Sequence, residues 1–152
     1  MEVKNTTLPL ITMVEYIRKG RILLNKFLEK NSLPHFEKEK TIYWLLNGFP
    51  IPNNVVIDNY GNVINGKETI EIINDFLNDR LEIKDVMFDK IKKDFLENLD
   101  KNFNKNSIKF SDFSIEIQEM INNFQITYTV VYFPTFQELE EYKKLIKQNS
   151  WN

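Results

Sequence analysis

The residues Asn65-Gly66-Lys67-Glu68-Thr69 combine side chains that could bind a phosphate group. They follow the apolar pair Val63-Ile64 and open a segment with helical spacing, so a strand passes into a helix N-terminus there. The amides of such a terminus attract anions, and Lys67 could add a full positive charge. Glu68 and Glu71 lie in the same first turns and repel an anion. Such acids ordinarily stabilise a helix by about 0.3–1 kcal/mol each, so we favour a structural role for this turn over phosphate binding.

Within this turn, Asn65-Gly66 is a pair typical of tight turns, because both residues tolerate a positive φ. A binding role for Asn65 is the alternative interpretation. We expect Gly66 to be required by its backbone conformation or by close packing. Lys67 and Thr69 are expected to face solvent, where substitutions change stability by less than about 0.5 kcal/mol.

Other acidic residues and the single histidine are weaker candidates for chemistry. Asp58 stands with Asn59 and Gly61 in a composition typical of a turn, which we favour over a metal ligand. The acids from Asp85 to Asp89 are scattered. His35 has no acidic or histidine partner that the sequence reveals, so a surface or loop position is favoured over acid–base catalysis. We therefore expect no catalytic residue, no metal and no cofactor.

Aromatic and basic residues raise the alternative of a nucleic-acid-binding surface. Rings can stack on bases, but aromatic residues at strand spacing belong more often to the core, and we favour the core here. The densest basic region is interleaved with acids, as in a solvated helix face. The aromatic candidates are Trp44, Tyr128, Tyr132, Phe133, Phe136 and Trp151, and the lysines are Lys90, Lys92, Lys93, Lys101, Lys105 and Lys109.

Hydrophobic spacing and turn residues predict the elements that position these side chains. Two capping boxes, Thr12-Met13-Val14-Glu15 and Thr135-Phe136-Gln137-Glu138, are expected to begin the first and the last helix. Further helices are expected after Pro34, over 67–78, within 84–106 and near 114–122. Strands are expected at 22–24, 55–57, 63–64 and 125–133. The sum is a single α+β domain over residues 1–152, with a small mixed sheet flanked by helices.

Composition excludes several classes of protein. The chain has 152 residues with 20 basic and 22 acidic side chains, and its net charge of −2 argues against a strongly basic nucleic-acid binder. It has no cysteine, hence no disulfide and no thiolate metal site. No apolar run is long enough to span a membrane, and the first residues do not form a signal peptide. We expect a cytoplasmic protein without a membrane partner. The lack of alanine beside abundant Asn, Lys and Ile indicates an AT-rich gene, as in low-GC bacteria, their phages or archaeal viruses.

Several segments, in their order, resemble the N-terminal domain of GmrSD-type modification-dependent restriction proteins, which has a ParB/sulfiredoxin-like fold. Residues 45–52 (LLNGFPIP) are similar to the family's "llnGiPIP" segment, and 63–69 (VINGKET) stand where it carries "viDGQQR". Residues 72–77 are similar to its "ttl-x-x-FL" helix, 110–113 to "f-x-dL" and 141–149 to "iF-x-rlN". The resemblance implies the same fold and an association with DNA or nucleotides.

The residues that carry the family's chemistry are mostly replaced. The DGQQR motif, thought to serve phosphodiester or nucleotide chemistry, becomes Asn65-Gly66-Lys67-Glu68-Thr69, which loses the acidic and the arginine side chain. A second motif, "FQR", falls on Phe27-Leu28-Glu29, with a reversed charge at Glu29. In the last motif Lys147 replaces arginine and Asn149 is retained. The chain ends where larger members continue, so we expect no effector domain.

These departures predict a catalytically degenerate, stand-alone domain that binds a macromolecular partner, with a protein as the expected partner. It would be a phage or viral factor acting on host defence or nucleic-acid machinery. One alternative is a weak metal-dependent nucleotidase or nuclease, with Lys67 and Thr69 on phosphate and Asp58 or Glu68 on a metal. Another is a non-catalytic DNA-binding protein, whose affinity the net charge of −2 would limit. The sequence does not indicate an oligomeric state.

Overall fold

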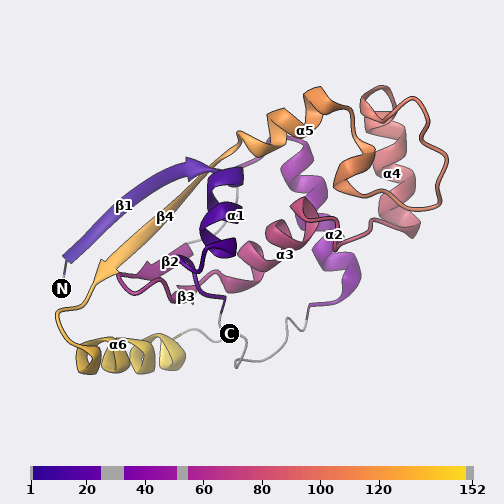
Figure 1. Cartoon of the computed structure of the whole chain (residues 1–152). Coiled ribbons are helices and arrows are strands. Elements are labelled where there is room, and N and C mark those ends of the chain that lie inside the picture. Colours follow the sequence, from indigo (N-terminus) through magenta and orange to yellow (C-terminus); the bar gives the residue numbers. More distant parts are fainter. Residues whose placement is uncertain (1, 25–32, 51–54, 150–152) are drawn as a thin grey trace.

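The computed structural model describes residues 2–24, 33–50 and 55–149. Within these ranges the chain is a single α+β domain of six helices and one four-stranded mixed sheet (Figure 1). The predicted fold class, a small mixed sheet flanked by helices, is therefore confirmed.

The sheet has the strand order β1-β4-β2-β3. Its long outer pair consists of β1, Glu2–Pro9, and β4, Gln125–Tyr132, which run antiparallel. Strand β4 pairs in parallel with β2, Val55–Asp58, and β2 forms the predicted hairpin with β3, Val63–Asn65. Strands β1 and β3 are thus the two edges of the sheet, and β1 is a strand that the sequence patterns did not predict.

Helices pack on both faces of the sheet. Ile126 and Tyr128 of β4 belong to the main core, together with residues of the first and third helices. Val131 of β4 lies on the opposite face and packs with Leu139 of the last helix (Figure 1). The helices are α1 Leu10–Arg18, α2 His35–Leu46, α3 Lys67–Leu77, α4 Asp85–Phe95, α5 Ile115–Asn122 and α6 Phe136–Asn149, with short 3₁₀ turns at Leu96–Asn98 and Phe110–Asp112.

Helix α3 supplies the centre of the core. Its residues Ile70, Ile73 and Phe76 recur at helical spacing and are almost completely buried. The ring of Phe76 also meets Phe110 edge to face, with centroids 5.6 Å apart. Burial of each such side chain contributes about 1.5–3 kcal/mol, so packing of α3 fixes the turn that precedes it.

The start of the first helix differs from the prediction. Helix α1 begins at Leu10, directly after β1, with Pro9 in extended conformation at its N-cap. The Leu10 amide bonds to the Phe124 carbonyl, which carries the strand pairing up to the helix. The capping box at Thr12 is therefore wrong, because Thr12 already lies inside the helix, and the Glu15 carboxylate pairs with Arg18.

The strand expected at 22–24 and the second capping box are each confirmed only in part. The strand expected at 22–24 is reduced to one parallel bridge, between Leu23 and Asn62, because its other residues find no strand to pair with in the described chain. The second capping box is confirmed in its first half, since the Thr135 hydroxyl accepts a hydrogen bond from the Glu138 amide at 3.3 Å.

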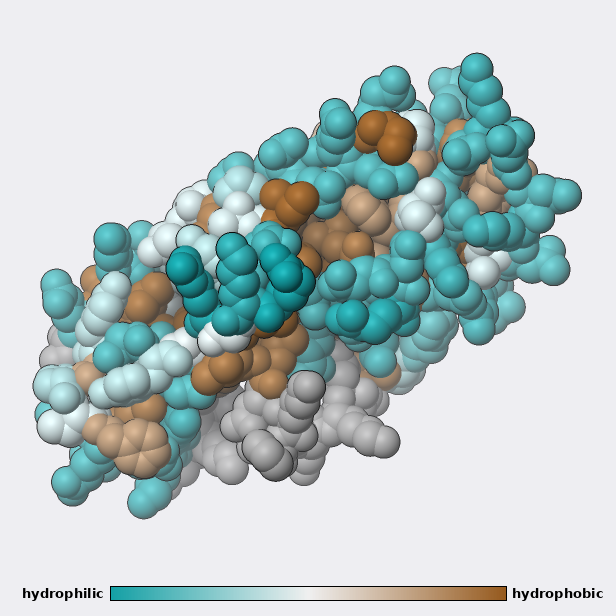
Figure 2. Space-filling model, viewed as in Figure 1, coloured by the Kyte–Doolittle hydropathy of each residue, from teal (hydrophilic) through white to brown (hydrophobic). Residues whose placement is uncertain are grey.

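Apolar side chains also reach the surface. Figure 2 shows them over α1 and α5, where Ile11, Ile115 and Met120 are exposed between hydrophilic neighbours. Scattered apolar residues of this kind are ordinary on protein surfaces.

Candidate functional site

The strand–helix turn predicted as the candidate site lies between β3 and α3. Gly66 is its pivot, with φ of +80° in the left-handed region, at the N-cap of α3. A Cβ added to Gly66 would lie 2.9 Å from Cγ2 and 3.0 Å from Cα of Val55 on the neighbouring strand β2. Both expected reasons for glycine, the positive φ and the close packing, therefore apply to this position.

The side chains of the turn are engaged in the structure of the domain. Lys67 Nζ lies 3.3 Å from the Glu71 carboxylate one helical turn later, and the Lys67 side chain is only 19% exposed. Glu68 lies exposed in the first turn of α3, where an acid complements the helix dipole. The charge on Lys67 is therefore balanced within the turn, as a structural role requires.

Thr69 does not face solvent, which corrects the prediction made for it. It is 8% exposed and lies among the buried residues of α3. Lys67 is also less exposed than expected. The reason is that α3 packs against α2 and also shares the main core with residues of β2 and β4, so it buries more than one stripe of its surface.

The other two motif segments are only partly described. Phe27, Leu28 and Glu29 lie outside the described residues. Lys147 and Asn149 lie in the last turns of α6. Earlier in α6, Tyr142 packs in one cluster with Ile64 of β3, directly before the turn. Strand β3 therefore contacts α6 through Ile64, whereas the turn after β3 leads into α3, which belongs to the main core on the other face of the sheet.

Asp58 acts as a turn residue. Its carboxylate accepts hydrogen bonds from the Tyr60 amide at 2.8 Å, the Asn62 amide at 2.9 Å and the Asn62 side chain at 2.9 Å. Asp58 lies at the hairpin turn before β3, and Glu68 lies beyond the other end of β3. The three residues of β3 span about 10 Å. These two acids, proposed together as alternative metal ligands, do not meet.

His35 is half-exposed at the start of α2, as predicted, but it has an acidic partner that the sequence interpretation missed. Its Nε2 lies 2.9 Å from the Glu82 carbonyl oxygen and 3.4 Å from the buried Glu39 carboxylate. Glu39 also accepts a hydrogen bond from the Lys84 amide. The i, i+4 spacing of His35 and Glu39 was the available signal, and the group ties α2 to the segment before α4.

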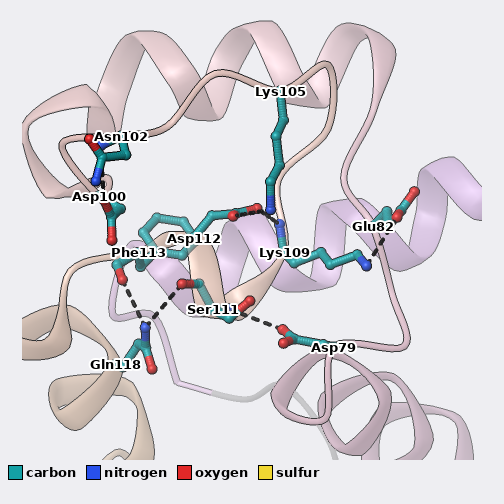
Figure 3. Close-up of polar contacts among 10 residues, drawn as sticks. All are labelled: Asp79, Glu82, Asp100, Asn102, Lys105, Lys109, Ser111, Asp112, Phe113 and Gln118. Carbon is teal, nitrogen blue, oxygen red and sulfur yellow. Dashed lines mark hydrogen bonds and ion pairs between the residues drawn. The ribbon is translucent and has the colours of Figure 1, made fainter.

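Two lysines of the basic region, Lys105 and Lys109, lie in the loop between α4 and α5 and are paired with acids (Figure 3). Lys105 Nζ lies 2.9 Å from the buried carboxylate of Asp112, and Asp112 also accepts a hydrogen bond from the Lys109 amide at 2.8 Å. The side chain of Lys109 pairs with Glu82 at 3.4 Å. The hydrogen bond to Asp112 raises the pKa of Lys105 above its ordinary value. These two positive charges therefore already have partners within the chain.

The aromatic candidates divide between core and surface. Tyr128 and Phe133 are buried, as predicted. Tyr132, Phe136 and Trp44 are exposed, and for them the core prediction is wrong, because β4 ends and α2 turns one face outward there. Trp151 lies outside the described residues.

Three exposed rings lie on α2 or directly after it, and we call them the α2 aromatic surface: Phe36, Trp44 and Phe49. These side chains belong to residues 44%, 45% and 49% exposed, respectively. The rings of Trp44 and Phe49 stack with centroids 4.5 Å apart, and Lys40 lies between Phe36 and Trp44 along the helix, 5.8 Å from the Phe36 ring. The i, i+4, i+8 spacing of 36, 40 and 44, out of phase with the buried Ile42 and Leu45, could have revealed this surface.

The chain matches none of the family models, curated proteins or solved structures with which it was compared. The resemblance to GmrSD-type domains and the ParB/sulfiredoxin-like fold therefore stay predictions from the motifs. Among the described residues, no helix is long and apolar enough to cross a membrane. In the same part of the chain, His, Asp and Glu residues form no group of three that could hold a metal ion.

Proposed function

We propose that this protein is a catalytically degenerate domain that binds a macromolecular partner, and that the partner is a protein. The observation that carries the proposal is the α2 aromatic surface. Large aromatic rings exposed side by side are unusual on a surface that meets only water. Aromatic residues are enriched at protein–protein interfaces and dominate their binding energy, which favours a partner that covers these rings.

The arrangement of the rings supports binding in a second way. The Trp44 indole donates a hydrogen bond from Nε1 to the Pro50 carbonyl at 2.9 Å, and its ring stacks on Phe49. Both contacts hold the indole in one orientation before any partner arrives. A contact surface that is already ordered loses less conformational entropy on binding.

Charge favours a protein over a nucleic acid as the partner. Lys40, the cation within the α2 aromatic surface, pairs with Glu37 at 3.7 Å. Lys105 and Lys109 are paired as well, and the whole chain has a net charge of −2. Phosphate neutralisation by unpaired cations supplies most of the affinity for nucleic acids. These observations support binding to a protein surface with an apolar pocket.

The resemblance of the motifs indicates the cellular process in which the proposed partner would take part. It supports a role in a cell's defence or nucleic-acid machinery, exercised by a phage or viral factor on its host. A cytoplasmic site of action agrees with a chain that contains no cysteine and so folds without disulfides. The engaged Lys67 and the turn-bound Asp58 support the non-catalytic form of the proposal.

Site-specific photo-crosslinking in host cells tests the proposal. A photoreactive phenylalanine analogue is placed at Phe36 in one protein and, as a control, at Leu96, which is also exposed but lies after α4. We expect one defined protein adduct from Phe36 and none from Leu96, with loss of that adduct in Trp44→Ala. Equal adducts from both positions would contradict the proposed surface. A parallel assay with nucleoside triphosphates, DNA and Mg²⁺ or Mn²⁺ should show no hydrolysis that Lys67→Ala removes.

A further inference from the structure

In the part of the chain that the structure describes, β1 is an edge strand, and no strand pairs with the backbone groups on its outer side. The bond from the Leu10 amide to the Phe124 carbonyl continues the antiparallel register of β1 with β4. In such a ladder hydrogen-bonded positions alternate, so the even-numbered residues of β1 pair with β4. The backbone groups of Val3, Asn5 and Thr7 consequently point away from β4.

Side-chain contacts agree with this alternation. Thr7 and Thr127 hydroxyls lie 2.8 Å apart, and the Thr129 hydroxyl donates to the Asn5 side chain at 3.0 Å. Close side-chain contacts of this kind are typical of the non-hydrogen-bonded positions of an antiparallel pair. On the far side of β4, the Val131 carbonyl accepts from Asn59, as the same alternation requires.

This edge is long, regular and exposed. Strand β1 pairs with β4 over eight residues in one uninterrupted register. Residues 2–5 are exposed, and Val3 presents an apolar side chain that is 56% exposed. Proteins usually blunt such an edge with a bulge, a proline or a charge. Pro9 closes one end, where it lacks an outward N–H, but residues 2–7 stay open.

The charges at the open end are self-complementary. When two β1 strands pair antiparallel, a residue whose backbone groups point away from β4 must lie opposite another such residue. Odd-numbered residues of one copy therefore face odd-numbered residues of the other. A twofold axis at Val3 places Glu2 of each copy opposite Lys4 of the other and brings the two Val3 side chains together. An axis at Lys4 would instead place like charges opposite each other, which is unfavourable.

We propose that two copies of this chain associate edge to edge through β1, antiparallel, with the twofold axis at Val3. The sheet then continues from one copy into the other, and the interface is isologous. Because only a few residues pair, the buried area lies below the roughly 1,200 Å² of a standard interface, so the dimer forms in a concentration-dependent manner. This surface is distinct from the α2 aromatic surface and does not depend on the function proposed above.

Charge reversal at β1 tests the pairing by sedimentation velocity. Glu2→Lys and Lys4→Glu should each abolish the dimer, because each places like charges opposite each other at two symmetric positions. The double variant should restore it, and so should an equimolar mixture of the two single variants. Lys93→Glu on α4 is the matched control, since it changes the charge equally at a distant exposed residue and should leave the dimer intact.

Cysteine crosslinking tests the register, since the chain has no native cysteine. The axis at Val3 sets the two Val3 Cα atoms about 5.5 Å apart, within the reach of a disulfide. In this register, the residue opposite Asn5 of one copy is four positions away from Asn5 of the other copy along the strand. The two Asn5 residues are therefore about 14 Å apart. Val3→Cys should therefore form a disulfide dimer under mild oxidation and Asn5→Cys should not. A wild-type monomer at concentrations up to about 1 mM, unchanged dimers in both charge reversals, or crosslinking at Asn5 alone would each overturn the proposal.

Discussion

Replacement of Gly66 by alanine tests whether the β3–α3 turn is required by its backbone. Two effects act against Gly66→Ala. The residue has a φ of +80°, which is unfavourable for an L-amino acid by about 1–2 kcal/mol. The added Cβ would also lie 3.0 Å from the Cα of Val55, a backbone atom of β2 that cannot rotate away. Such overpacking adds about 1–3 kcal/mol, so the free energy of unfolding should fall by about 2–5 kcal/mol.

The chain offers a matched control at Gly48. Its φ of +74° is nearly the same, but a Cβ added there meets nothing within 4 Å. Gly48→Ala therefore measures the conformational effect alone, about 1–2 kcal/mol. The difference between the two alanine variants isolates the contact of the turn with β2.

Urea unfolding followed by circular dichroism measures both variants. With a slope of about 2 kcal/mol per molar urea, Gly66→Ala should lower the midpoint by about 1–2.5 M and Gly48→Ala by about 0.5–1 M. Val55→Ala removes the Cγ2 atom that lies 2.9 Å from the added Cβ, so the double variant should be more stable than the sum of the single effects predicts. Equal midpoints for Gly66→Ala and Gly48→Ala would refute the close-packing argument.

Three further substitutions have defined outcomes. Asp112→Ala leaves the Lys109 amide without its carboxylate partner and should lower the free energy of unfolding by about 1–3 kcal/mol in urea titration. Thr69→Ala should lower the free energy of unfolding by more than about 0.5 kcal/mol, because Thr69 is buried, and a smaller change would contradict its placement. The hydrogen bond that Tyr43 donates to Asp94 raises the pKa of Tyr43, so its stabilising effect is complete below about pH 10 and is lost as pH rises through the folded-state pKa. Tyr43→Phe should therefore remove one late step from the tyrosinate absorbance titration, and an unchanged titration would contradict this assignment.

Turn residues and the spacing of apolar residues predicted those helices and strands whose sequence signal lies within a few neighbouring residues. The β2–β3 hairpin, the helix from Lys67 and its buried face follow from turn residues and from helical spacing, and the structure has them within a residue or two. Gly66 was recognised because Asn-Gly pairs favour a positive φ, a property of the residues themselves. The sequence signal for each of these features lies within a few neighbouring residues, although the packing that stabilises the features comes from other parts of the chain.

Strand β1 was not predicted because its stability comes from far along the sequence. Its residues are mostly polar and exposed, with Leu8 as its only buried residue, so no alternating apolar pattern marks it. The strand exists because β4, more than a hundred residues later, supplies the ladder. Tertiary contacts also bury Thr69, which was expected to face solvent, and leave Trp44 exposed, although it was expected in the core.

The burial of Thr69 also bears on how the resemblance to DGQQR-motif domains relates to function. At this position the family carries an arginine, whose guanidinium must reach a phosphate. In this chain the position is 8% exposed, so an arginine would have to enter the core or displace the helix. Threonine at this position fits the buried face of α3, whereas the longer, charged arginine side chain does not. Asn65→Asp together with Thr69→Arg should consequently lower the free energy of unfolding before it could create a phosphate site, and a double variant that is as stable as the wild type would contradict this reasoning.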